Sequence, residues 1–140
     1  MKALVFAALL ALAACVTMTP AEQAALQEQA ARPVTCSGSD DCEVKWGRAI
    51  QWVLSNSQYR IQVQTDQLIQ TAGPTPDSPV PAFVISRVAM GGGNYSFSLQ
   101  GGCDNPFGCV PSLLESQASF VDAVMGGPTK PAPPPATPAH

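Results

Sequence analysis

Cysteines are the residues of this chain whose type and spacing fit a defined chemistry best. Four of the five cysteines fall into two pairs with five residues between the partners: Cys36 and Cys42, then Cys103 and Cys109. Structural zinc ligands usually lie roughly two to four residues apart and often include histidine, whereas the one histidine here is the final residue, His140. A redox pair favours two intervening residues. The spacing therefore predicts disulfides, with no metal and no other cofactor.

The four cysteines allow three pairings, which the sequence does not separate rigorously. We favour Cys36 with Cys42 and Cys103 with Cys109, because each pair encloses a turn-rich segment, 37–40 and 104–108. Closing each short loop should stabilise the domain by about 2 kcal/mol in the chain-entropy model. Bridges between the two pairs would close longer loops and stabilise more.

The fifth cysteine ends an apolar N-terminal segment. Lys2 is followed by an uncharged run from Ala3 to Ala14, which is shorter than the ~20 residues of a membrane-spanning helix and typical of a signal peptide. The residues Leu12-Ala13-Ala14-Cys15 resemble the lipobox of bacterial lipoproteins. The resemblance implies cleavage before Cys15, a diacylglycerol thioether on its sulfur and acylation of its new amino group, for example by palmitate. The alternative is an ordinary secretory signal that happens to contain this cysteine.

The residue after the lipobox bears on the membrane that would hold the anchor. In the enterobacterial pattern, an aspartate directly after the lipidated cysteine favours the inner membrane, and this chain has Val16 there. The resemblance therefore implies the outer membrane, with the domain facing the periplasm. Removal of Cys15 from the count also leaves an even number of cysteines, as expected for an exported protein with disulfides.

Carboxylates could support hydrolysis of cell-wall glycan, which needs two acids facing each other across a cleft. Asp66 lies on the polar face of a predicted strand, and nothing in the pattern places a second acid opposite it. Asp40, Asp41 and Glu43 crowd a predicted helix start, where negative charge is stabilising. His140 lies on the C-terminal tail, so no serine or cysteine has an evident imidazole base. These residues favour a protein that is not an enzyme.

Two aromatic residues are candidate partner contacts. Trp52 lies off the main apolar stripe of its predicted helix, so it either contacts a partner or covers the edge of the core. Phe107 lies within the segment enclosed by the second cysteine pair and is an anchor if it is exposed. Arg60 and Arg87 lie on predicted strands, where they bind an anionic ligand or pair with Asp66. We expect the pairing.

Apolar residues at spacings of three and four predict two helices. The first runs from Asp40 to about Asn56. Its predicted buried face comprises Cys42, Trp46, Ala49, Ile50, Val53 and Leu54. The second starts at a capping box of Ser112 and Glu115 and stops at Gly126. Its predicted buried face comprises Leu114, Ala118, Val121 and Met125.

Three strands are predicted between the helices. Residues 59–71 alternate in polarity, residues 82–90 are apolar on both faces, and residues 95–99 alternate again. The proline-rich segment 72–81 is a predicted loop. Residues 91–94 form a predicted hairpin turn, since the glycines lack the Lys-Ser/Thr of a phosphate-binding loop. The predicted fold is α+β: a three-stranded antiparallel sheet flanked by an N-terminal and a C-terminal helix and stapled by disulfides.

The chain divides into four predicted segments. Residues 1–14 are the signal peptide, 15–33 a tether that includes a helix-prone stretch, and 34–126 the folded domain. Residues 127–140 form a proline- and alanine-rich tail that should be extended and disordered.

The charge pattern excludes two partner classes. The chain has seven Lys and Arg against ten Asp and Glu, and loss of Lys2 with the signal would leave six against ten, a net charge of −4. Because basic residues nowhere form a run, nucleic-acid binding is not expected. Electrostatic docking on anionic lipid is not expected for the same reason.

Several segments resemble small uncharacterised envelope lipoproteins of Gram-negative bacteria. They are Trp46-x2-Ala49-x2-Trp52-Val53-x2-Asn56-Ser57, Thr65-Asp66-x2-Ile69-x-Thr71 and Phe107-Gly108-Cys109-x-Pro111. The resemblance implies an envelope location and supplies no activity. The leading hypothesis is a lipid-anchored, non-enzymatic binding module that contacts an envelope protein or peptidoglycan. The alternative is a small cell-wall-directed hydrolase or ligand-modifying enzyme.

Overall fold

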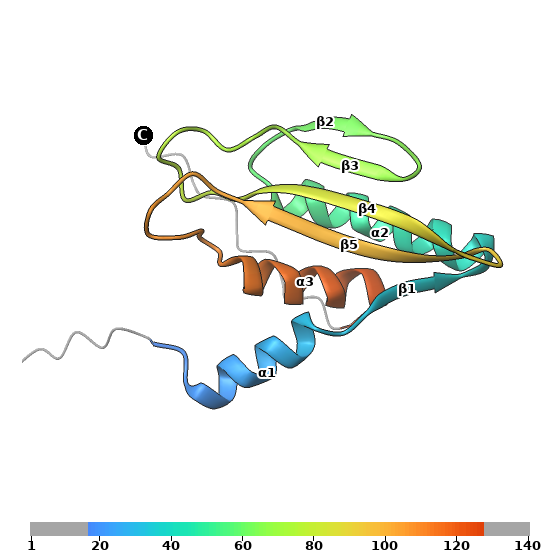
Figure 1. Ribbon diagram of the computed structural model, residues 1–140, viewed down its shortest axis with the longest axis horizontal. Coiled ribbons are helices and arrows are strands. Elements are labelled where there is room, and N and C mark those ends of the chain that lie inside the picture. The colour runs from blue at the N-terminus through green and yellow to red at the C-terminus, as the bar shows by residue number, and fades with distance from the viewer. Residues whose placement is uncertain (1–16, 128–140) are drawn as a thin grey trace, which may run out of the picture.

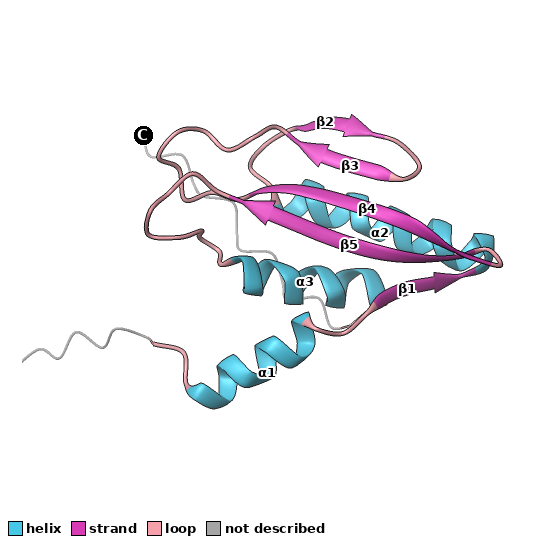
Figure 2. Cartoon of the chain, viewed as in Figure 1, coloured by secondary structure: helices cyan, strands magenta, loops and turns pink. Residues whose placement is uncertain are grey.

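The computed structural model describes residues 17–127. The predicted signal peptide, Cys15 and nearly all of the predicted tail lie outside these residues. Within them the chain forms the elements shown in Figure 1 and Figure 2: α1 (Pro20–Ala30), β1 (Val34–Ser37), α2 (Gly38–Asn56), β2 (Ile61–Gln64), β3 (Leu68–Thr71), β4 (Ala82–Gly91), β5 (Asn94–Gly102) and α3 (Leu113–Met125). The predicted α+β class is confirmed.

The sheet has five antiparallel strands in the order β1-β5-β4-β3-β2, so the prediction of three strands is wrong. One reason is that the segment predicted as a single strand, 59–71, contains a turn. The hydroxyl of Thr65 accepts hydrogen bonds from the backbone N–H groups of Gln67 (3.1 Å) and Leu68 (2.9 Å). Side chains that cap backbone groups in this way stabilise turns. The segment therefore folds back on itself as the β2–β3 hairpin.

The second reason is β1, an edge strand of four residues that no periodicity predicted. Val34 and Cys36 point into the core, exposed to 3 % and 2 %, and lie opposite Phe97 and Tyr95 of β5. Two buried positions in four residues are too few to distinguish a strand from a loop.

The predicted β4–β5 hairpin is present and forms the centre of the sheet. Its turn is made by Gly91, Gly92 and Gly93, all with positive φ, followed by Asn94. A positive φ is strained for residues with a side chain, which explains the glycine run. Phe83 and Ile85 of β4 are buried.

The predicted first helix is present as α2, and it begins at Gly38 rather than Asp40. Its buried residues are Cys42, Trp46, Ala49, Trp52 and Val53. Leu54 was predicted to be buried and is 60 % exposed. Successive residues on a helix are about 100° apart, so Leu54 turns away from the core on one side of Val53 while Trp52 turns toward α3 on the other.

The predicted second helix is present as α3, with both of its predicted end signals. The Ser112 hydroxyl accepts from the N–H of Glu115, the Glu115 carboxylate accepts from the N–H of Ser112, and Gly126 ends the helix in the left-handed conformation. The buried face is rotated from the prediction, because Met125 is 40 % exposed. Its members are Ser116, Ala118, Phe120, Val121 and Val124.

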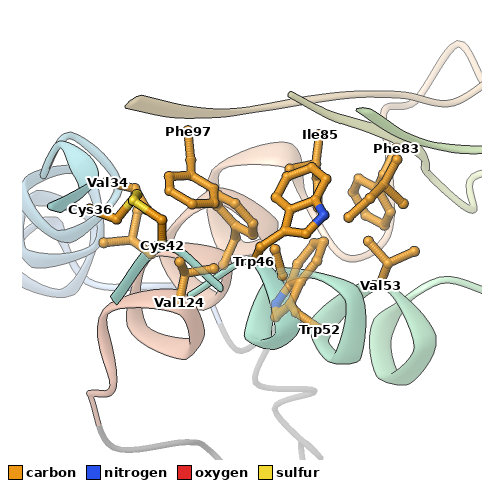
Figure 3. Packing of buried hydrophobic residues seen from close by; sticks show 14 residues of the cluster. Val34, Cys36, Cys42, Trp46, Trp52, Val53, Phe83, Ile85, Phe97 and Val124 are labelled. Carbon is orange, nitrogen blue, oxygen red and sulfur yellow. A yellow bond between two sulfur atoms is a disulfide. The ribbon is translucent and has the colours of Figure 1, made fainter. Parts of the chain in front are cut away.

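The core lies between the sheet and helices α2 and α3, as Figure 3 shows. Trp46 of α2 packs on Phe97 of β5, with ring centroids 5.9 Å apart. Trp52 packs edge-on against Phe83 of β4 at 5.0 Å. Aromatic pairs in these geometries contribute beyond their buried area.

Helix α1 comes from the segment predicted as a tether, and it lies against α3 (Figure 1). The side-chain amide of Gln29 donates to the backbone oxygen of Ala118 (3.2 Å) and to the carboxylate of Asp122. Arg32 forms an ion pair with the same carboxylate at 2.6 Å. No residue of α1 is fully buried. The helix is thus held at the surface by polar contacts near its C-terminal end.

Candidate functional site

Both disulfides are present, in the favoured pairing. Cys36 is bonded to Cys42, and Cys103 to Cys109, with Cα atoms 5.0 Å and 5.6 Å apart. The first bridge ties β1 to the first turns of α2 and is buried, with both residues 2 % exposed. The second is half-buried and closes a surface loop between β5 and α3. The two bridges therefore have different surroundings although their spacing is the same.

The loop closed by Cys103 and Cys109 presents Phe107, whose side chain is 97 % exposed. Asn105 organises the loop: its side-chain oxygen accepts from the N–H of Phe107 (2.9 Å) and its backbone oxygen accepts from the N–H of Gly108 (3.2 Å). Asparagine stabilises turns through such bonds to the backbone two residues on. The predicted contact residue is thus displayed on a covalently closed, hydrogen-bonded turn.

A second loop, residues 72–81 between β3 and β4, supports the first. The amide of Asn105 donates to the backbone oxygen of Asp77 (3.1 Å), and the N–H of Val110 donates to the backbone oxygen of Pro79 (2.8 Å). Loop 72–81 is itself held by Tyr59, whose hydroxyl accepts from the N–H of Thr75 at 3.1 Å. The position of Phe107 is therefore fixed from outside the disulfide as well.

Two further apolar side chains, between the loop and the first residue of α3, are exposed. Val110 is 69 % exposed and Leu113 is 41 % exposed. Leu113 also lines a shallow cavity of about 160 Å³ whose other lining residues are Phe83, Leu99, Gly101, Ser116 and Gln117. A Cβ on Gly101 would lie 2.9 Å from Leu113, so glycine permits this close approach. We call Phe107, Val110 and Leu113 the apolar loop patch.

Trp52 is not a contact residue, and that prediction is wrong. The side chain is 4 % exposed and packs edge-on against Phe120 of α3 with ring centroids 5.4 Å apart. Its indole N–H donates to the hydroxyl of Ser119 at 2.9 Å, which satisfies the one polar atom of the ring. Trp52 therefore belongs to the core, in agreement with the alternative prediction that it covers the edge of the core.

Arg87 points into the protein, and none of the ion pairs formed among residues 17–127 joins Arg60 or Arg87 to Asp66, so the predicted pairing is also wrong. Its guanidinium carbon lies 5.0 Å from the ring centroid of Trp46 and 5.1 Å from that of Tyr95. One nitrogen pairs with Glu43 at 3.4 Å, while Nε and Nη1 are buried without a hydrogen-bond partner among the described residues. The cation is held by aromatic faces, which attract it electrostatically.

The acidic residues considered as catalytic candidates lie near the start of α2 and in the turn between β2 and β3. At the start of α2, Asp41 accepts from the backbone N–H of Ser37 and from Lys45, both at 3.0 Å. The hydrogen bond from Ser37, and then that from Lys45, lowers the pKa of the Asp41 carboxyl. Asp66 is exposed between β2 and β3. Across residues 17–127, no group of three or more His, Cys, Asp or Glu side chains is placed to hold a metal ion.

None of the helices formed by residues 17–127 is both long and apolar enough to span a bilayer.

Three residues of this site were not predicted from the sequence: Asn105, which organises the loop, and Val110 and Leu113 of the apolar loop patch. A signal for the first was present, because Asn-Pro-x-Gly over residues 105–108 is typical of a turn. The exposure of Val110 and Leu113 had no local signal, since it depends on how α3 packs.

Comparison with known proteins identifies no relative of this chain. The chain matches no protein-family model, no curated protein and no solved structure at a significant level. The functional argument therefore depends on the residues of this chain.

Proposed function

We propose that this chain is an envelope lipoprotein, anchored through lipid on Cys15 to the periplasmic face of the outer membrane, whose domain acts as a non-enzymatic contact module. The loop from Cys103 to Cys109 is its contact surface, and Phe107 is the main contact residue. The observation that carries the proposal is the display of Phe107, 97 % exposed, on a loop that a disulfide closes.

An exposed aromatic ring on a preformed loop is well suited to binding. Leaving a phenylalanine in water forgoes about 2 kcal/mol of burial free energy, which a partner can recover. Large side chains at interface centres commonly supply most of the binding energy. A preformed loop also loses less conformational entropy on binding than a flexible one. The bridge and Asn105 therefore favour tight contact at Phe107.

The anchor part of the proposal is supported by the sequence before the domain. Residues Leu12 to Cys15 resemble a lipobox. The two disulfides are typical of exported proteins in oxidising compartments. Multiple acyl chains give a durable membrane anchor.

Site-specific crosslinking in living cells tests the contact. A photoreactive amino acid at position 107 should give a specific crosslinked product, whereas the same residue at Gln62, exposed on the edge strand β2, should not. The mass of the product distinguishes a protein, a peptidoglycan fragment and a lipid. Equal or absent labelling at the two positions would contradict the contact role of Phe107.

Labelling with radioactive palmitate tests the anchor. The wild-type chain should incorporate the label and fractionate with the outer membrane, and Cys15→Ala should do neither. Incorporation that survives this substitution would refute Cys15 as the lipidated residue.

A further inference from the structure

The N-terminal end of α1 and the Phe107 loop lie at the same end of the domain. Figure 1, drawn with the longest axis horizontal, shows the start of α1 at the lower left and the β5–α3 and β3–β4 loops at the upper left. The β4–β5 turn lies at the opposite end. Since β4 has ten residues, strand geometry puts the two ends about 30 Å apart.

The chain between Cys15 and α1 is short. Four residues, Val16 to Thr19, separate Cys15 from Pro20, the first residue of the helix. Five Cα–Cα steps span at most about 18 Å. Thr19 caps the helix through a reciprocal pair of hydrogen bonds with Glu22, so the helix does not unwind readily to lengthen this connection.

We propose that the Phe107 loop contacts the lipid bilayer that holds the Cys15 anchor, with the Phe107 ring in the interfacial region and the domain standing with this end toward the membrane. The inference rests on the proposed lipid anchor and names the partner of the same contact surface. If Cys15 is lipidated, the start of α1 stays within about 18 Å of the lipid attachment point. Because the start of α1 and the loop lie toward the same end of the long axis, this short connection turns the loop end of the domain toward the bilayer.

The exposed side chains of the loop are mainly apolar, as expected for a loop that inserts into the interfacial region of a bilayer. Between Cys103 and Pro111 the exposed side chains include Pro106, Phe107 and Val110, and the segment contains no lysine or arginine. Asp104 is its one charged residue. The contact is therefore apolar and insensitive to salt, which agrees with the absence of basic runs in the sequence.

Because the lipid anchor already holds the domain at the membrane, insertion of the Phe107 ring alone is sufficient to orient it. One phenylalanine would hold a soluble protein on a membrane only weakly. For a tethered domain, however, loop insertion is an intramolecular step at high effective concentration. A modest gain from burying Phe107 then orients the whole domain.

Tryptophan fluorescence of the full lipidated chain tests the inference. Phe107→Trp and the control Met90→Trp, which is 63 % exposed beside the opposite turn, are each reconstituted into phosphatidylcholine vesicles with ordinary or brominated acyl chains. The native Trp46 and Trp52 are 5 % and 4 % exposed and give a constant background. Mass spectrometry of the N-terminal peptide measures lipid on Cys15 in the same samples.

We expect F107W to shift to shorter wavelength and to be quenched by brominated lipid at low and high salt, with M90W unaffected. Unquenched F107W in protein that carries the lipid overturns the membrane contact and leaves the anchor standing. Equal quenching of both variants overturns the end-on orientation. A chain without lipid on Cys15 overturns the anchor, and the inference with it, because the distance argument begins at that residue.

Discussion

Removing the two disulfides one at a time should destabilise the domain by clearly different amounts. Each bridge closes a loop with the same sequence separation of six residues. In the chain-entropy model, a loop of this length contributes about 2 kcal/mol at 25 °C. Loop length alone therefore predicts equal losses for Cys36→Ala/Cys42→Ala and for Cys103→Ala/Cys109→Ala.

Burial separates the two variants. Cys36 and Cys42 are 2 % exposed within the core, so replacement by alanine removes two buried sulfur atoms and leaves space that the core fills incompletely. Each deletion of this size costs about 1 kcal/mol. The Cys36/Cys42 variant should thus lose about 4 kcal/mol, and the Cys103/Cys109 variant, whose sulfurs are half-buried, about 2 kcal/mol.

Urea unfolding followed by the emission of Trp46 and Trp52 measures both losses. The Cys103/Cys109 variant should also be cut faster by chymotrypsin after Phe107, because the loop that carries this residue is no longer closed. Equal losses, or a larger loss for the surface bridge, would refute the argument from burial. An unchanged cleavage rate would show that the bridge does not hold Phe107 in place.

Three further predictions concern the interior and α2. Trp52→Phe should cost about 2 kcal/mol in urea unfolding through lost volume and the lost hydrogen bond to Ser119, with crosslinking at position 107 unchanged; a stable variant that loses crosslinking would return Trp52 to the contact surface. Arg87→Met should keep or raise the unfolding midpoint because it removes buried N–H groups that have no partner among residues 17–127, whereas Arg87→Lys should lower it; a severe loss in Arg87→Met would show that the contacts of the cation with Trp46 and Tyr95 outweigh the cost of those groups. The hydrogen bond from the Ser37 backbone, and then that from Lys45, lowers the pKa of the Asp41 carboxyl below its unfolded value. The ionised carboxylate therefore stabilises the fold above the unfolded pKa, and this stabilisation is lost as pH falls through the folded pKa. Asp41→Asn should flatten the acid loss of stability below about pH 4, and an unchanged acid profile would contradict this.

Local signals predicted the parts of the fold that local interactions determine. The capping box of Ser112 and Glu115 marked the start of α3, and the glycine run marked the β4–β5 turn. The disulfide pairing that the turn-rich segments favoured, without excluding the other two, is the one present. In each case the residues that form the feature lie within a few positions of one another.

Long-range packing decided the features that the sequence did not reveal. Trp52 is buried because Ser119, 67 positions later, accepts its N–H and α3 covers its ring. β1 is a strand because β5 offers it an edge. Alternate residues of β4 face the core, and Arg87 is buried because it lies on the same face of the strand as Phe83 and Ile85. The sequence alone does not show which face of this strand is buried, because residues 82–90 are apolar on both faces.

The local nature of both bridges also bears on how the protein acquires them. If the chain is exported amino end first as proposed, Cys36 and Cys42 reach the oxidising compartment before Cys103 and Cys109 do. With the Cys15 sulfur blocked by lipid as proposed, an oxidase that joins each cysteine to its nearest neighbour in order of arrival produces the two native bonds directly. Of the three possible pairings, the native one is thus the one that requires no disulfide isomerase, and maturation should depend on an oxidase alone.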